Sequence, residues 1–263
     1  MITMKFLTMN IAFASDPVWD GINNFRHRLG VLMDHILTEK PDVFCMQEVR
    51  QYQYDLLKPF LKGAGYSFIY NQRETDMSGE GLMVCLRDET TEFQTMERYW
   101  FSDTPQIPGT RFPNQTEYTR IGQEALVRYL PTGEFFRVYN NHFECRNPEA
   151  CTKSMQLLLS RLQKKQAVYP CRFFIAGDLN SLPESDAIQT ACHFDAFPVI
   201  DVTKELPGTA FSFHDPGVAH GKVDYIFTDR TTAGEAREVR LLDDHANGIW
   251  LSDHYPVCAD FAF

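Results

Sequence analysis

Short runs of strand-forming residues recur along the chain and outnumber its helical segments. The runs are rich in valine, isoleucine, phenylalanine, tyrosine and methionine, and clusters of polar residues, glycine and proline bound them. We predict strands over residues 5–12, 42–49, 66–71, 81–87, 124–130, 135–143, 172–179, 222–228 and 256–263. A chain with this pattern needs sheets whose apolar faces are buried against other elements.

Helical periodicity is clear in two segments, Asn23–Glu39 and Lys153–Ala167, where apolar residues recur every three or four positions. Pro41 ends the first helix because proline disfavours helical geometry in the residue before it. Shorter helices are predicted over Tyr52–Lys62 and Ser185–Cys192. Because helices interrupt the strands without strict alternation, we predict one α/β domain over residues 1–263, with two sheets packed face to face and helices on the outside.

The composition is that of an ordinary globular protein with an excess of acidic side chains. The 25 lysines and arginines and 35 aspartates and glutamates give a net charge of −10. Proteins that hold nucleic acid mainly through its phosphates are usually basic, so this charge disfavours an extended duplex as a partner. An excess of carboxylates instead suits a chain that gathers some of them around a divalent cation.

The sequence has no feature that directs it to a membrane. It lacks a stretch of about 18 apolar residues, and its N-terminal segment is typical of a strand rather than a signal sequence. Seven cysteines are scattered, several of them in apolar runs, which indicates reduced, mostly buried thiols and a cytoplasmic protein. Cys145 and Cys151 are close in sequence but lack the paired spacing of a zinc site.

Polar side chains stand where the apolar runs begin or end. They occur in six places: Asn10, Gln47-Glu48, Asn140-Asn141-His142, Asp178-Leu179-Asn180, Asp224 and Asp253-His254. An ionised carboxylate beside an apolar strand is costly unless it is paired or bound to a metal. The repetition therefore predicts one shared cleft at one rim of the sheets.

Each group on its own also has a structural interpretation. Glu48 fits a solvated strand end, Asp178-Leu179-Asn180 an Asx turn before Pro183, and His142 a hydrogen-bonded core histidine. The irregular segment Tyr99–Arg120 is a further candidate, because long irregular loops in compact domains are often functional. The combination of all the groups favours a functional site.

In this order, the six groups resemble the motifs of the endonuclease/exonuclease/phosphatase superfamily of metal-dependent hydrolases, which has a DNase I-like fold. The matching blocks span nearly the whole chain: Leu7–Ile11, Met46–Val49, Asn140–Phe143, Gly177–Ser181, Val223–Phe227 and Ser252–Val257. Tyr99–Pro105, followed by Arg120, is similar to a bacterial subgroup that lies nearer the Ccr4/nocturnin branch than DNase I. The resemblance implies a four-layer α/β sandwich of two packed mixed β-sheets flanked by helices, with the site at one rim.

The resemblance also implies a role for each polar residue. The expected metal ligands are Glu48 as the main Mg²⁺ ligand, with Asn10 and Asp253 beside it, and Mn²⁺ can substitute. The expected catalytic residues are Asp178, which orients and deprotonates the attacking water, Asn180, His142 and His254, which contact the phosphoryl group, and Asp224, which holds His254. These residue types suit the chemistry, because Mg²⁺ prefers oxygen ligands and phosphoryl transfer needs charge neutralisation and an in-line water.

One position departs from the pattern of the subgroup. Its members commonly carry a second histidine three residues after the first, where this chain has Cys145. A thiol is a weak donor, so this phosphate contact is lost or supplied elsewhere. The expected substrate-binding residues are Arg120, Cys145, Trp100, Phe213 and His214.

Together these expectations describe a Mg²⁺-dependent phosphodiesterase, nuclease or phosphatase that uses an activated water. The expected substrate is a phosphodiester or phosphomonoester, either a small molecule or a short single-stranded nucleic acid end. Trp100, Phe112 or Phe213 can stack a base if they do not belong to the core. The alternative is a catalytically weak or silent module that binds a phosphate ligand on the same scaffold. The oligomeric state is left open.

Overall fold

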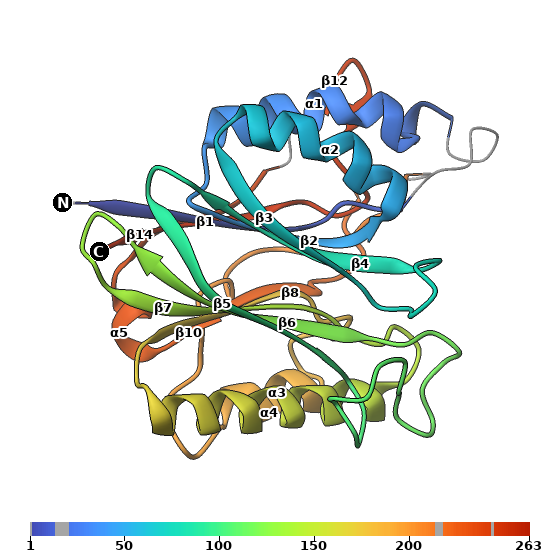
Figure 1. Cartoon of the computed structure of the whole chain (residues 1–263). Coiled ribbons are helices and arrows are strands. Elements are labelled where there is room, and N and C mark those ends of the chain that lie inside the picture. The colour runs from blue at the N-terminus through green and yellow to red at the C-terminus, as the bar shows by residue number, and fades with distance from the viewer. Residues whose placement is uncertain (1, 14–20, 214–217, 243–244) are drawn as a thin grey trace.

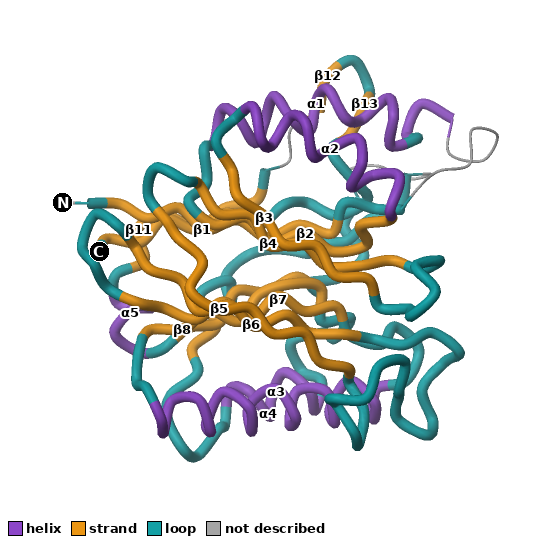
Figure 2. Tube along the Cα trace, in the orientation of Figure 1, coloured by secondary structure: helices purple, strands orange, loops and turns teal. Residues whose placement is uncertain are grey.

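The computed structural model describes residues 2–13, 21–213, 218–242 and 245–263. In these residues two six-stranded sheets pack face to face, and helices cover both outer faces (Figure 1). Figure 2 shows the strands in the two inner layers and the helices in the outer ones, which confirms the predicted four-layer α/β sandwich. None of the described helices has the length and apolar character needed to cross a membrane.

The first sheet has the strand order β11-β14-β1-β2-β4-β3. Its strands are β1 (Thr3–Asn10), β2 (Val43–Arg50), β3 (Tyr66–Gln72), β4 (Glu80–Arg87), β11 (Ala236–Leu241) and β14 (Val257–Ala262). The sheet is mixed, because β1 and β2 are parallel and the other neighbours are antiparallel. Two helices, α1 (Phe25–Glu39) and α2 (Gln51–Gly63), cover its outer face (Figure 1).

The second sheet has the order β5-β6-β7-β8-β10-β9. Its strands are β5 (Thr91–Trp100), β6 (Ile121–Tyr129), β7 (Phe135–His142), β8 (Arg172–Asp178), β9 (Ile200–Asp201) and β10 (Asp224–Thr228). Here β7 and β8 are the parallel pair. This sheet is covered by α3 (Pro148–Val168) and α4 (Asp186–Cys192). The shorter elements are η1 (Gly21–Asn23), α5 (Arg230–Gly234) and the hairpin of β12 (His245–Ala246) and β13 (Ile249–Trp250).

Aromatic side chains fill the space between the two sheets. Phe6 of β1 stacks on Phe174 of β8 with ring centroids 4.9 Å apart, and Phe136 and Phe261 pack edge-on against the same ring. All four side chains are buried, and burying one phenylalanine contributes about 1.5–3 kcal/mol. Two further apolar clusters join α1 and α2 to the first sheet and α3 and α4 to the second.

Strand register brings the polar strand ends to one rim. Asn10 pairs with Gln47 in the parallel β1–β2 ladder, and His142 pairs with Asp178 at the end of the β7–β8 ladder. Asp224 begins β10 and lies opposite the same Asp178. The residues that the sequence placed at strand ends therefore lie at one shared rim.

Buried amides link the two sheets beneath this rim. The Gln47 amide nitrogen donates to Asn140 Oδ1 over 2.7 Å, and the Asn140 nitrogen donates to the carbonyl oxygens of Met46 and Met83. Gln47 and Asn140 are both fully buried. Asn141 donates to the carbonyl oxygens of its own sheet and is buried as well. These three members of the polar groups therefore act as structural hydrogen-bonding residues.

Among the described residues, five strands lie outside the predicted runs: β5, β11 and the two-residue strands β9, β12 and β13. β5 and β11 each form one edge of a six-stranded sheet, where hydrogen bonding to a single neighbouring strand holds the strand in place. Charged residues such as Glu97 and Arg98 interrupt the apolar pattern of β5, as is common in edge strands. Helix α3 also begins earlier than predicted, at Pro148, because the side chain of Asn147 accepts hydrogen bonds from the first free N–H groups.

Gly177 allows β7 and β8 to approach closely just before the rim. Its φ is +127°, in a region that residues with a side chain rarely adopt, and a Cβ atom there would collide with the carbonyl oxygen of Asn141. The next residue is Asp178, so this close approach also sets the position of its carboxylate.

We predict that Gly177→Ala destabilises the protein by at least about 2 kcal/mol, because the backbone must move and adopt a strained conformation. The matched control is Gly30→Ala in α1, where an added Cβ meets no other atom within 4 Å. This change should stabilise the exposed helix by about 0.5–1 kcal/mol. Urea unfolding of both variants checks the prediction, and equal midpoints for Gly177→Ala and the wild type would contradict it.

Candidate active site

Two clusters of carboxylate and imidazole groups meet at the rim. One consists of Glu48, Glu80 and His142, the other of Asp178, Asp224 and His254, and within each cluster the ligand atoms lie within 4.8 Å of one another. The clusters are adjacent, since His142 Nε2 is 3.5 Å from Asp178 Oδ2. The first and second sheets thus contribute to one continuous site.

Asp178 lies at the centre of the site and is held on both oxygens. The Asn10 amide donates to Oδ2 over 3.0 Å, and the backbone N–H of Asn180 donates to Oδ1 over 2.9 Å. Burial raises the pKa of the Asp178 carboxyl to about 6; His254 partly offsets this increase, and Asp224 adds to it. The carboxylate is therefore more basic than an ordinary aspartate and has a fixed orientation.

His254 and Asp224 form a pair on one side of Asp178. His254 Nδ1 lies 2.8 Å from Asp224 Oδ2, and Nε2 lies 3.9 Å from Asp178 Oδ2. Burial lowers the pKa of His254, but the carboxylates of Asp224 and Asp178 outweigh it, and the pKa lies well above the ordinary value. The two carboxylates therefore favour the protonated imidazolium form of the ring.

His142, on the other side of Asp178, has the opposite character. Its pKa is well below the ordinary value, because the ring is buried and the guanidinium groups of Arg120 and Arg73 repel a proton. Arg120 Nη1 lies 3.0 Å from His142 Nε2, and since arginine has no acceptor, the ring nitrogen accepts the hydrogen bond. The surroundings thus favour a proton on His254 and disfavour one on His142.

Glu48 reaches the site through an irregularity in β2. Its φ is +60°, and the pairing of β2 with β4 shifts between Met46 and Val49, which marks a bulge that turns the side chain toward the rim. The backbone N–H of Phe13 donates to one carboxylate oxygen over 3.1 Å. Burial raises the pKa of Glu48 to about 7, and the neighbouring carboxylates of Glu80 and Asp253 add to the increase.

The remaining expected groups line the same rim. Asn180 adopts a left-handed backbone conformation, with φ of +46°, and its amide nitrogen donates to the carbonyl oxygen of Phe143. Asp253 accepts a hydrogen bond from Ser252, whose hydroxyl also donates to the carbonyl oxygen of Asn10. Both Asn180 and Asp253 are partly exposed; the backbone of Asn180 contacts Asp178, and Asp253 is close enough to Glu48 and His254 to raise the pKa of each.

Glu80 and Arg73 are site residues that the sequence analysis missed. Glu80 belongs to the Glu48 cluster and forms an ion pair of 2.6 Å with Arg73. Both side chains are almost fully buried. The pairing of β4 with β2 carries Glu80 to the rim, opposite Arg50. Glu80 could have been identified from the sequence as an acidic residue at the start of an apolar run, but it lies outside the motif blocks that matched the superfamily.

The expected substrate-binding residues other than Trp100 divide into three groups. Arg120 and Cys145 are at the site: Arg120 Nη2 lies 3.5 Å from the exposed Cys145 thiol. Phe213 is partly buried and packs under Arg28, whose guanidinium carbon lies 5.3 Å from the ring centroid. His214 lies outside the described residues.

Trp100 requires a correction, because the structure places it in the core. It is 3% exposed, packs with Leu82 and Ile121, and its indole N–H donates to the carbonyl oxygen of Arg73. Arg98 covers its ring, with the guanidinium carbon 4.4 Å from the centroid. Neither face is free to stack a base. Phe112 is similarly buried, in the apolar cluster next to α3. Trp100 and Phe112 are therefore core residues rather than surfaces on which a base could stack.

Comparisons with known proteins agree with this geometry. The profile of the Endonuclease/Exonuclease/phosphatase family matches residues 7–254. Nocturnin from Rattus norvegicus is 22% identical in an alignment of 258 residues that covers 91% of this chain and 59% of nocturnin. This chain thus spans about three fifths of the length of that relative, and the match agrees with the expected placement near the Ccr4/nocturnin branch.

Two solved structures from Bacteroides share the fold along the whole chain. An endonuclease/exonuclease/phosphatase from Bacteroides vulgatus superposes with a TM-score of 0.86 at 24% identity and covers 100% of both chains. A mannosyl-6-phosphatase from Bacteroides thetaiotaomicron has a TM-score of 0.87 at 20% identity and covers 99% of this chain and 100% of that one. With the profile match over residues 7–254, these findings show that this protein belongs to the Endonuclease/Exonuclease/phosphatase family, whose members are phosphoester hydrolases.

Proposed function

We propose that this protein is a divalent-metal-dependent phosphoesterase that hydrolyses a phosphate ester by attack of an activated water. The observation that carries this proposal is the convergence of a buried, oriented carboxylate, Asp178, with a protonated His254 and the acidic Glu48 cluster at one rim. Charge neutralisation and an oriented water are the main requirements of phosphoryl transfer. Family membership supports the same chemistry.

Glu48 is the proposed main ligand of Mg²⁺, for which Mn²⁺ can substitute, with Asn10 and Asp253 contributing further oxygens. The donor set fits a hard cation, because it consists of carboxylate and amide oxygens. Burial and the neighbouring carboxylates of Glu80 and Asp253 raise the pKa of Glu48 to about 7. A bound cation would reduce the repulsion among these carboxylates, as a proton on Glu48 does in its absence. When bound, the metal neutralises charge on the phosphoryl oxygens.

Asp178 is the proposed general base. Asn10 and the backbone of Asn180 hold its two oxygens, which leaves a fixed carboxylate for a water molecule. A pKa of about 6 keeps it largely ionised at neutral pH, yet makes it a better proton acceptor than an ordinary aspartate. Asn180 is the proposed donor to a phosphoryl oxygen.

His254, His142 and Arg120 are the proposed contacts of the phosphate. The imidazolium of His254 attracts an anionic phosphoryl group, and Asp224 keeps the ring protonated and oriented. On the opposite side Arg120 provides a positive charge next to the neutral His142, so that this wall also attracts the anion. The thiol of Cys145 lies beside Arg120, at the position where the family resemblance leads us to expect a second histidine.

We predict that Asp178→Asn folds, retains metal binding and loses at least about 10²-fold in turnover, because the shape remains but the base is removed. The assay is hydrolysis of p-nitrophenyl phosphate and bis-p-nitrophenyl phosphate with Mg²⁺, Mn²⁺ or EDTA. The control is Asp195→Asn at an exposed position, which should keep wild-type rates. Turnover of Asp178→Asn within a few-fold of the wild type would remove Asp178 from the catalytic assignment, and metal-independent or absent hydrolysis in the wild type would overturn the proposed function.

Glu48→Gln should weaken Mg²⁺ binding by at least about tenfold, because even residues that only support a ligand typically contribute 10–100-fold to metal affinity. The fold should survive. The pKa of Glu48 is raised in the folded, metal-free protein, so ionisation of this carboxyl lowers the free energy of unfolding as the pH rises above 4.5. Glutamine cannot ionise, and the melting temperature of Glu48→Gln at pH 7 should therefore be no lower than that of the wild type. Isothermal titration calorimetry and thermal unfolding measure the two effects. Glu205→Gln, at a position with an 86% exposed side chain, is the control, and unchanged affinity of a folded Glu48→Gln variant would refute the assignment.

The substitution Asp224→Asn should lower the pKa of His254, and Asp253→Asn should lower it by a smaller amount. The reason is that Asp224 lies 2.8 Å from the ring and contributes more to the raised pKa than Asp253 does. Loss of its negative charge destabilises the imidazolium, so the ring releases its proton at a lower pH. Titration of the imidazole signals by NMR checks the order, and the reverse order would show that Asp224 does not control His254.

A further inference from the structure

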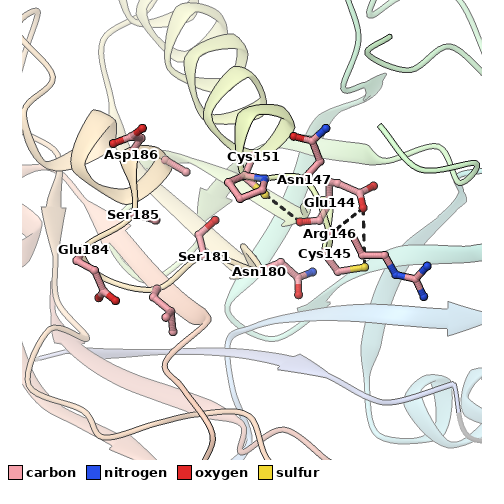
Figure 3. Close-up of a pocket in the computed structure, with 13 residues that line it drawn as sticks. Glu144, Cys145, Arg146, Asn147, Cys151, Asn180, Ser181, Glu184, Ser185 and Asp186 are labelled. Atoms are coloured by element: carbon pink, nitrogen blue, oxygen red, sulfur yellow. Dashed lines mark hydrogen bonds between the residues drawn. The ribbon is translucent and has the colours of Figure 1, made fainter. Parts of the chain in front are cut away.

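A cavity of about 500 Å³ opens beside the proposed catalytic residues (Figure 3). Its walls come from the loop that follows β7, residues 144–147, from the start of α3, and from the segment that follows β8, residues 180–187. Figure 3 shows Asn180 between Ser181 and Cys145. Because the backbone of Asn180 holds Asp178, this cavity directly adjoins the site of the phosphate. Its volume lies in the range of about 300–1,000 Å³ that is typical of small-molecule pockets.

Two carboxylates on one wall have free hydrogen-bonding capacity. Glu184 and Asp186 are exposed, and none of the hydrogen bonds and ion pairs found within the described part of the chain involves either carboxylate group. By contrast, Glu144 on the other wall is buried and accepts hydrogen bonds from Thr116 and from the backbone of Arg146. The cavity therefore offers Glu184 and Asp186 as acceptors, and the exposed Arg146 as a donor on the opposite side.

The lining distinguishes between chemical classes of substrate. Among the described residues that line the cavity there is no aromatic side chain, so a nucleobase would have nothing to stack on. The two exposed carboxylates, Glu184 and Asp186, face one exposed guanidinium, that of Arg146, and repel a second phosphate group, as in a nucleotide chain or a polyphosphate. Hydroxyl groups suit these walls, because carboxylates accept from them and Arg146 donates to them, while Leu182 and Pro148 can contact carbon.

We propose, resting on the phosphoesterase function above, that this cavity binds the organic group of the substrate and that this group is a polyol. The substrate is then a sugar or polyol phosphate monoester. In the reaction the water oxygen bonds to phosphorus and the bond from phosphorus to the sugar oxygen breaks. The proton that the water gives to Asp178 reaches the released oxygen through solvent, so the products are the free polyol and inorganic phosphate.

The test compares kcat/KM of the 263-residue protein with Mg²⁺ on glucose 6-phosphate, p-nitrophenyl phosphate and a 5′-phosphorylated single-stranded oligonucleotide. The wild type should prefer the sugar phosphate to the oligonucleotide by at least about tenfold, since a hydrogen bond to a charged group contributes roughly that much or more. Glu184→Gln and Asp186→Asn should each lower the ratio of kcat/KM for the sugar phosphate over p-nitrophenyl phosphate by about tenfold, mainly through KM. Both side chains are exposed, so these variants should fold.

Glu205→Gln, which changes an exposed acid away from the cavity, is the matched control and should leave the ratio unchanged. A preference of the wild type for the oligonucleotide, or an unchanged ratio in both cavity variants, would overturn the polyol proposal while leaving the phosphoesterase intact. Absence of Mg²⁺-dependent hydrolysis of every substrate would instead overturn the phosphoesterase function itself. The two failures are therefore distinguishable.

Discussion

The hydrogen bond from the Asn10 amide to the Asp178 carboxylate joins the two sheets at the point where the site is built. Asn10 ends β1 in the first sheet, and Asp178 ends β8 in the second. Asp178 is 2% exposed, and a buried carboxylate without donors would be costly to maintain. Beneath it, Gln47 and Asn140 link the sheets through a second amide contact. The Asn10 amide thus supplies a donor to the carboxylate and the Gln47 amide supplies one to Asn140, which lowers the cost of burying these groups above an aromatic core.

Electrostatics divide the site into two walls with different proton affinities. On the Asp224 side, carboxylates stabilise a proton on His254, whereas on the Arg120 side guanidinium groups exclude one from His142. Each arrangement places a cationic side chain, His254 on one side and Arg120 on the other, in the neighbourhood of Asp178. The acids around Glu48 provide the complementary negative region. An anionic phosphate and a divalent cation are a pair of ligands that this division of charge accommodates.

Local sequence patterns identified much of this architecture. The apolar runs that end in Asn10, His142 and Asp178 are strands, and their polar ends share a rim because parallel neighbours end at the same edge of a sheet. The pattern did not predict β5, whose charged residues are tolerated at the edge of a sheet. The aromatic residue Trp100 illustrates a second limit, since its type is compatible with a binding surface as well as with the core that it occupies.

The sequence by itself determined which residue types stand at the ends of apolar runs, and hence the fold class and part of the membership of the candidate rim. Strand periodicity and the chemistry of carboxylates, amides and imidazoles are local properties of the chain. Only the tertiary structure decided which histidine has the raised pKa, that Glu80 and Arg73 join the site, and that Glu184 and Asp186 line a cavity beside it. The physical reason is that pKa values, ion pairs and cavities depend on burial and on neighbours that are distant in sequence.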